Sequence, residues 1–226
     1  MAEGLLAGLV FLSVLPSTVQ SCVVFTAIAR GNVAGAVMGA TASNLAGIAL
    51  TPLLVALLLG SSQLVVGPEP ISRIVLLLLV PFLLGLLVGR FVRGVLERYR
   101  RLLTLMDRGV IVAVVYSAFS RGVRQGVWQQ VSPGQVALVI AAAALLLSIT
   151  SAAAWWVPAL WRASRPDRVA TLFCGSTKSL ATGLPMATVL FPPQLIGLVI
   201  VPIIIYHPLQ IVVCSLLAGR MAGEER

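Results

Sequence analysis

Long apolar runs separated by short polar links dominate the chain. A helix that crosses about 30 Å of hydrocarbon needs about 20 mostly apolar residues. The chain offers seven such runs, at residues 4–29, 33–59, 72–92, 104–120, 134–161, 169–191 and 194–218. No link between them is long enough for a folded domain outside the membrane. The pattern predicts an all-α fold, a polytopic membrane helix bundle of about seven transmembrane helices.

Two of these runs are interrupted by polar and helix-breaking residues. The first run contains Pro16, which removes a backbone donor and obstructs the preceding helical turn. The sixth run contains two glycines and a proline. We therefore expect discontinuous helices, broken at Pro16–Ser21 and Gly175–Pro185, that cross near the middle of the membrane. Both breaks carry Ser-Thr followed by a long polar residue and Ser, a similarity typical of inverted repeats.

Composition supports a lipid environment. Of the 226 residues, 59% are hydrophobic and 10% charged, and the mean hydropathy is +1.03. The net charge of +9 does not indicate nucleic-acid binding, because the basic residues are mostly arginines in short links without interleaved aromatic residues. The cysteines Cys22, Cys174 and Cys214 stand apart in apolar segments. We expect reduced packing residues there, with no metal site and no cofactor.

The arginines predict the orientation of the chain. Seven crossings place twelve arginines on one side and three on the other, and positively charged links stay in the cytoplasm. This predicts a multi-pass protein of the cell inner (plasma) membrane with a cytoplasmic C-terminus and residue 1 outside. A first helix that enters from outside, with three residues ahead of it, leads us to expect about three further spans upstream.

Polar residues in the middle of apolar spans mark the expected binding site, because broken helices expose carbonyl groups and half-helix ends to ions. The expected substrate- and ion-binding residues are Ser17, Thr18, Gln20, Ser21, Asn44, Ser176, Thr177, Lys178 and Ser179. The alternative is that these side chains only pack helices together. For Asn44, a position facing the breaks and a role in joining helices are equal alternatives.

Lys178 is the single lysine of the chain and lies about nine residues into its span, roughly 13 Å deep. A charge at that depth costs about 2.5 to 3.5 kcal/mol, and all seven acidic residues lie at span ends or in links. The partner of the ammonium is therefore backbone carbonyl groups, a residue outside this chain or an anionic substrate; snorkelling is the alternative. His207 could relay protons, but a hydrogen bond across helices is the favoured interpretation.

Several segments resemble the bile acid:sodium symporter superfamily, and most closely its solute carrier 10 member 7-like bacterial subfamily. They are Leu15–Ser21, Ala29–Val33, Leu50–Pro52, Met106–Val110, Phe173–Ala181 and Tyr206–Gln210. The resemblance implies ten helices, of which this chain would be the last seven. It divides the chain into a first part of a core domain at 1–60, panel-domain helices at 61–132 and a second, inverted core repeat at 133–226.

The resemblance also indicates a difference in ion coupling. Sodium-coupled members carry a glutamate and a Gln-Asn pair at the second crossing, where this chain reads Phe173–Lys178 without an acid. At the first crossing their Ser-Asn pair resembles Ser21 and Cys22. We expect the Lys178 ammonium to take the place of a bound cation.

The leading hypothesis is a secondary active transporter, or its C-terminal part, that moves a small organic anion by alternating access without sodium coupling. The alternative is a non-transporting membrane regulator of calcium homeostasis that acts through partner binding. We do not expect an enzyme, because no mid-membrane acid orients His207 and no metal-ligand spacing supports hydrolysis. The expected partners are the lipid bilayer and a small organic anion, not nucleic acid, and the sequence indicates no oligomeric state.

Overall fold

The computed structural model describes residues 3–60, 72, 76, 80–89, 91–124, 126 and 131–223. Within these residues the regular elements are helices, which confirms the all-α prediction. They are α1 (Glu3–Val14), α2 (Val19–Ile28), α3 (Val33–Leu59), α5 (Val80–Gly89), α6 (Arg93–Arg98), α7 (Arg100–Arg124), α8 (Pro133–Leu160), α9 (Arg165–Ser176), α10 (Leu180–Leu190) and α11 (Pro193–Gly223).

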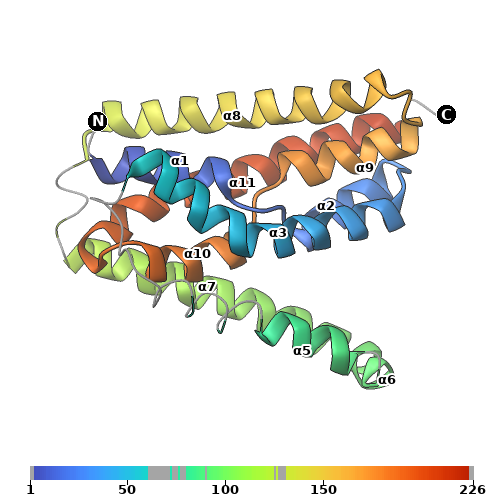
Figure 1. The fold of residues 1–226 in the computed structure, drawn as a ribbon, viewed down its shortest axis with the longest axis horizontal. Helices are drawn as coiled ribbons and strands as arrows, with labels where there is room; N and C mark the ends of the chain where they lie inside the picture. Colours follow the sequence, from blue (N-terminus) through green and yellow to red (C-terminus); the bar gives the residue numbers. More distant parts are fainter. Residues whose placement is uncertain are drawn as a thin grey trace.

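The helices before residue 60 and after residue 132 form one bundle (Figure 1). Helix α1 packs against α11 and α3, while α8 packs against α9 and α11. Helices α5 and α7 run along the side of the bundle opposite α8, and the two ends of the chain lie at opposite ends of the bundle. The largest hydrophobic cluster, which includes Phe11, Phe191 and Tyr206, joins α1, α10 and α11.

The first predicted break is present and shorter than expected. Helix α1 ends at Val14 and α2 begins at Val19, and the two are bent by 56°. The non-helical residues are therefore 15–18, not Pro16–Ser21. The prediction of the far limit was wrong because only Pro16 disrupts the helix, so that α2 resumes three residues after it.

The second predicted break is also present and shorter. Residues 177–179 are non-helical between α9 and α10, so Gly175 still belongs to α9 and Pro185 lies inside α10. The hydroxyl of Ser179 accepts a hydrogen bond from the backbone N–H of Thr182 at 3.2 Å, which caps the start of α10. This cap fixes where the helix resumes, and the single bond lost at Pro185 does not interrupt it.

Three helices, α3, α8 and α11, are long and apolar enough to cross a membrane, and the bent pair α1–α2 adds a fourth candidate span. These four candidate spans match the predicted runs at 4–29, 33–59, 134–161 and 194–218. The run at 72–92 lies partly outside the described residues, the run at 104–120 lies within α7, and the run at 169–191 is divided between α9 and α10. The membrane bundle is therefore supported, and the count of seven spans stays a prediction.

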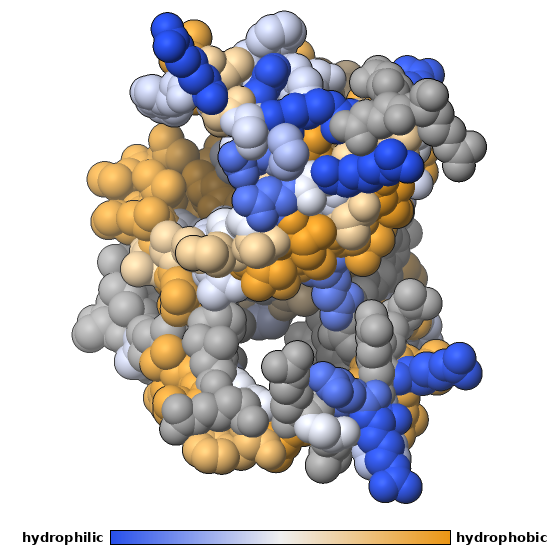
Figure 2. All heavy atoms as spheres, turned by 90° about the vertical axis from the view of Figure 1, so that its right-hand side faces the viewer, coloured by the Kyte–Doolittle hydropathy of each residue, from blue (hydrophilic) through white to orange (hydrophobic). Residues whose placement is uncertain are grey.

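The helix ends rich in arginine meet at one end of the bundle. The backbone N–H of Asn32 donates to the Pro166 carbonyl at 2.9 Å, and the Arg165 guanidinium donates to the Met221 carbonyl at 2.9 Å. Hydrophilic side chains gather on this end of the molecule (Figure 2). Five of the twelve arginines that the sequence assigned to one side of the membrane lie at this end, in or next to the ends of α2, α8, α9 and α11: Arg30, Arg162, Arg165, Arg168 and Arg220.

Candidate substrate and ion site

The two broken segments contact each other. The backbone N–H of Ser179 donates to the Pro16 carbonyl at 2.8 Å, and the hydroxyls of Ser17 and Thr177 share a hydrogen bond at 3.2 Å. Peptide groups freed by a helix break need partners when water is excluded. Here part of that need is met by the other break, which brings residues some 160 positions apart into one site.

Helix α3 holds the first break in place. The backbone N–H of Ser17 donates to the Ser43 hydroxyl at 3.0 Å, and the Asn44 amide donates to the Ser17 carbonyl at 2.7 Å. Two turns further along α3, the hydroxyl of Thr51 donates to the Val14 carbonyl at 2.8 Å. Both backbone groups of Ser17 are therefore paired with side chains of a single neighbouring helix.

Helix α11 holds the second break in the same way. The backbone N–H of Lys178 donates to Oε1 of Gln210 at 2.6 Å, and Nε2 of Gln210 donates back to the Lys178 carbonyl at 3.0 Å. The hydroxyl of Tyr206, one turn earlier, donates to the Ser176 carbonyl at 2.6 Å. Gln210 is fully buried, so this pairing is shielded from competing water.

The Lys178 ammonium reaches the end of α1. Its Nζ donates to the Ser13 carbonyl at 2.9 Å and to the Leu15 carbonyl at 3.0 Å. Carbonyls at a helix C-terminus have no partner within the helix and lie at the negative end of its dipole. Of the partners considered for this lysine, backbone carbonyl groups are the ones that contact it.

Asn44 fulfils both roles that the sequence left open. Besides its bond to Ser17, its side-chain oxygen accepts a hydrogen bond from the Thr182 hydroxyl at 3.1 Å. The Thr182 hydroxyl in turn accepts from the Ser179 hydroxyl at 2.9 Å. Asn44 therefore faces the first break and joins α3 to α10 at the same time.

The other expected residues lie close to this site. The Ser176 hydroxyl bonds to its own helix at the Leu172 carbonyl, 2.6 Å away. Thr18 is the residue before α2 and makes no side-chain cap, while Gln20 and Ser21 lie in the first turn of α2, exposed and half-buried. The structure thus joins Ser17, Asn44, Thr177, Lys178 and Ser179 in one network, and places Thr18, Gln20, Ser21 and Ser176 beside it.

Sequence reasoning missed several members of the network, namely Ser43, Thr51, Thr182, Tyr206 and Gln210. A readable signal was the spacing of four residues between Tyr206 and Gln210, which places both on one helix face. The expectation for His207 was partly wrong. Its Nδ1 pairs with Gln210 Nε2 at 3.2 Å, so its hydrogen bond lies within α11 and not across helices.

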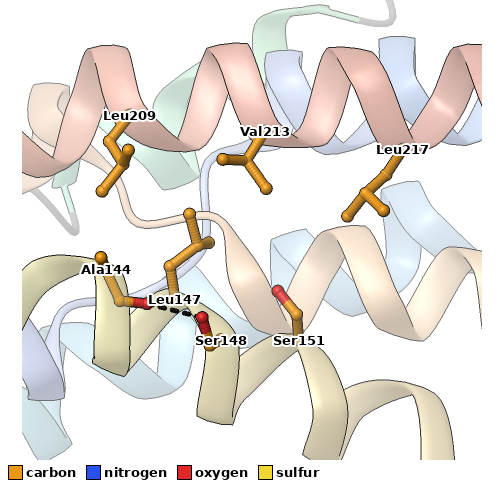
Figure 3. Close-up of a pocket in the computed structure, with 7 residues that line it drawn as sticks. All are labelled: Ala144, Leu147, Ser148, Ser151, Leu209, Val213 and Leu217. Carbon is orange, nitrogen blue, oxygen red and sulfur yellow. Dashed lines mark hydrogen bonds between the residues drawn. The ribbon is translucent and has the colours of Figure 1, made fainter.

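A separate groove lies between α8 and α11 (Figure 3). It encloses about 240 Å³ and is lined by Ala144, Leu147, Ser148, Ser151, Leu209, Val213 and Leu217. The Ser148 hydroxyl donates to the Ala144 carbonyl of its own helix at 2.8 Å. The lining contains no charged side chain and none of the break residues, so the candidate site remains at the breaks.

Comparison with known proteins gives a match over residues 1–223 to the SBF-like CPA transporter family. The chain is 39% identical over 216 residues to the putative symporter YfeH of Escherichia coli (strain K12), covering 96% of this chain and 65% of that protein. It is 41% identical over 216 residues to the uncharacterized protein PA2026 of Pseudomonas aeruginosa, covering 95% and 65%.

A vertebrate relative matches as well. The chain is 32% identical over 224 residues to sodium/bile acid cotransporter 7-B of Xenopus laevis, covering 95% of this chain and 63% of that protein. The chain therefore spans about 65% of the length of its bacterial relatives. The match over nearly the whole chain confirms the resemblance seen in the motifs: this chain belongs to the SBF-like CPA transporter family, the bile acid:sodium symporter-like membrane transporters.

Proposed function

We propose that this chain forms the transport site of a secondary active transporter, or of its C-terminal part, that moves a small organic anion by alternating access. Family membership and the symporter and cotransporter names of the relatives support a transporter. The observation that carries the proposal is the contact between the two breaks, with the Lys178 ammonium held at the end of α1.

The charges at the breaks favour an anion. Helices α2 and α10 both begin at the breaks, so their positive dipole ends point toward the place where the breaks meet. The side chain of Thr18 makes no capping hydrogen bond at the N-terminus of α2. Lys178 adds an ammonium with three donors, of which the Ser13 and Leu15 carbonyls take two. Of the expected ligand residues, Ser17 and Thr177 lie in the two breaks and bond to each other, and Gln20 and Ser21 lie in the first turn of α2.

The arrangement of helices supports a two-domain transporter. We assign α1–α3 (within residues 1–60) and α8–α11 (within 133–226) to a core domain, and α5–α7 (within 61–132) to a panel domain along its side. The matching ways in which α3 holds Ser17 and α11 holds Lys178 support two inverted repeats within the core. Alternating access would then be a movement of the core against the panel.

Transport by the full-length protein in proteoliposomes tests the proposal. Uptake of labelled taurocholate and of smaller carboxylates and sulfates is measured for the wild type and for Lys178→Ala. Ser148→Ala is the matched control, because its hydroxyl bonds only to its own helix in the described structure. We expect saturable uptake of at least one anion, its loss in Lys178→Ala and its retention in Ser148→Ala. If the wild-type protein moves no anion but binds a partner protein, the hypothesis of a non-transporting regulator replaces this one.

A further inference from the structure

Two cysteines from different broken helices lie side by side. The thiol of Cys22 in α2 is 4.0 Å from the Ala36 carbonyl of α3, and the thiol of Cys174 in α9 is 3.3 Å from the same oxygen. Cys22 additionally donates to the Val19 carbonyl of its own helix at 3.3 Å. Two sulfur atoms and one carbonyl oxygen therefore converge at a single point between α2, α3 and α9.

A cavity leads to this point. It encloses about 220 Å³ and is lined by Gly35, Gly39, Asp167, Ala170, Thr171 and Cys174. Cys22 is fully buried, whereas Cys174 is half-buried and lies on the cavity wall. Hydrogen bonds from Asn32 and Ser164 lower the pKa of Asp167, which keeps its carboxylate ionised at the arginine-rich end of the cavity. The lining thus offers a negative charge near one end and a thiol on its wall.

The donor set selects a soft ion. Sulfur ligands prefer Cu(I) and similar thiophilic ions, whereas calcium, magnesium and sodium prefer several oxygen ligands. A tetrahedral zinc site needs about four ligands. The described residues contain no group of three or more His, Cys, Asp or Glu side chains that could hold a metal ion. Two thiols are therefore too few for zinc and suit a monovalent ion of low coordination number.

We propose that Cys22 and Cys174 form a binding site for a soft monovalent cation, Cu(I) or Ag(I), that enters through the cavity at Asp167. On binding, one thiol releases its proton to the cavity, so that the ion and one thiolate leave no net charge in a buried site. No oxidation state changes. The bound ion bridges α2 and α9, and therefore opposes any movement of one broken helix against the other.

A disulfide between the two cysteines is the competing outcome. The cavity opens near the arginine-rich end of the bundle, which the sequence predicts to be cytoplasmic. Thiols are kept reduced in that compartment, which favours metal binding over a disulfide. The proposal stands apart from the transport proposal, since it concerns neither Lys178 nor the Ser and Thr residues of the breaks.

Titration of the purified full-length protein with Ag(I), which does not oxidise thiols, tests the site. Bound silver per chain is counted after desalting in the wild type, Cys22→Ser, Cys174→Ser and Cys214→Ser. The last variant is the matched control, because Cys214 is a buried cysteine that contacts Ser176. We expect Cys214→Ser to match the wild type and each of the other two to bind at the lost site at least tenfold more weakly. Saturating Ag(I) should raise the unfolding temperature by about 4 °C in the wild type and in Cys214→Ser only.

Silver binding that is equal in Cys22→Ser and the wild type would overturn the proposal, since one thiol would then be enough. So would an absence of silver binding by the wild type. Mild peroxide treatment provides a second readout. If it lowers the mass of the wild type by two hydrogens and links peptides containing Cys22 and Cys174, while silver does not bind, the pair is a redox switch instead.

Discussion

At the scale of single residues, the ammonium of a lysine within an apolar bundle is stabilised by hydrogen bonds to backbone carbonyl oxygen atoms. The carbonyls of Ser13 and Leu15 accept from the Lys178 ammonium, and the break in the first helix is what makes them available. An ammonium in hydrocarbon without such partners would have a much higher free energy than this hydrogen-bonded one. The break and the lysine therefore depend on each other, although they lie in different halves of the chain.

Lys178→Ala should destabilise the protein, because it leaves two carbonyls at the end of α1 without their partner. Leu15 is buried, and an unsatisfied buried acceptor costs about 1 to 3 kcal/mol. We expect a lower unfolding temperature in detergent, read from the intrinsic fluorescence of the purified protein. Lys178→Arg keeps the charge but presents a planar fork, so it should restore stability only in part. Unchanged unfolding of Lys178→Ala would show that the lysine merely extends toward the membrane surface.

Gln210→Leu should be at least as damaging, since it removes both partners of the Lys178 backbone while keeping a similar volume. We expect a loss of roughly 2 kcal/mol in the free energy of unfolding, from two hydrogen bonds in a buried setting. Gln194→Leu is the matched control, because Gln194 is exposed in the first turn of the same helix. Denaturant titration of both variants makes the comparison; equal stability would contradict the assigned role of Gln210.

The sequence could identify Lys178, Ser17 and Thr177 because each is polar in an apolar run that also contains helix breakers. The spacing of Tyr206 and Gln210 places both on one helix face, but it could not show that they hold the second break, because a polar residue in an uninterrupted apolar helix is equally well explained as a packing residue. What distinguishes them is the backbone they face, which belongs to a segment 30 or more residues away. That information depends on tertiary structure.

At the scale of elements, α3 and α11 each hold one broken helix in place through hydrogen bonds from their side chains to the backbone of the break. The close fit of α3 against the first break depends on Gly47, because a Cβ at that position would lie 2.7 Å from Cβ of Pro16. The proline ring cannot rotate away from such a contact. The positions of both breaks could be predicted from Pro16 and the Gly-Ser-Thr segment, but their lengths could not, since the Ser179 cap and local contacts decide where a helix resumes.

Gly47→Ala should therefore destabilise the protein by about 1 to 3 kcal/mol, the usual cost of overpacking. Gly219→Ala is the control, because it should not lower the free energy of unfolding. A Cβ at Gly219 meets no atom within 4 Å, so the higher helix propensity of alanine should leave stability unchanged or raise it by up to about 1 kcal/mol. Thermal unfolding of the two variants under the same conditions decides between them. A Gly47→Ala protein as stable as Gly219→Ala would mean that α3 and the first break are less tightly packed than this geometry requires.

At the scale of the whole molecule, the arginine-rich helix ends and the C-terminus lie at the same end of the bundle. The positive-inside rule then predicts that this end faces the cytoplasm. A fluorescent protein fused after Arg226 should be bright in cells, and alkaline phosphatase fused at the same place should be inactive. The opposite pair of results would invert the predicted orientation, and with it the side from which the Cys22–Cys174 cavity opens.

We expect transport by this protein to be independent of sodium. Lys178 places an ammonium on carbonyl oxygens at the crossing of the two breaks, where an ion-coupled carrier would hold a cation. Two unit charges 4 Å apart repel each other by about 4 kcal/mol at an effective dielectric constant near 20. That repulsion lowers the affinity for sodium roughly a thousandfold, since each 1.4 kcal/mol is a factor of ten.

Counterflow exchange in proteoliposomes measures this without any ion gradient. Labelled anion outside is exchanged against unlabelled anion inside, first in sodium and then in choline on both sides, so that only the need for sodium itself differs. We expect rates within about twofold of each other, because a fixed ammonium already supplies the positive charge that balances the anion at the breaks. A strict requirement for sodium would show that a sodium ion binds despite Lys178. The ammonium would then have to leave the Ser13 and Leu15 carbonyls during the transport cycle.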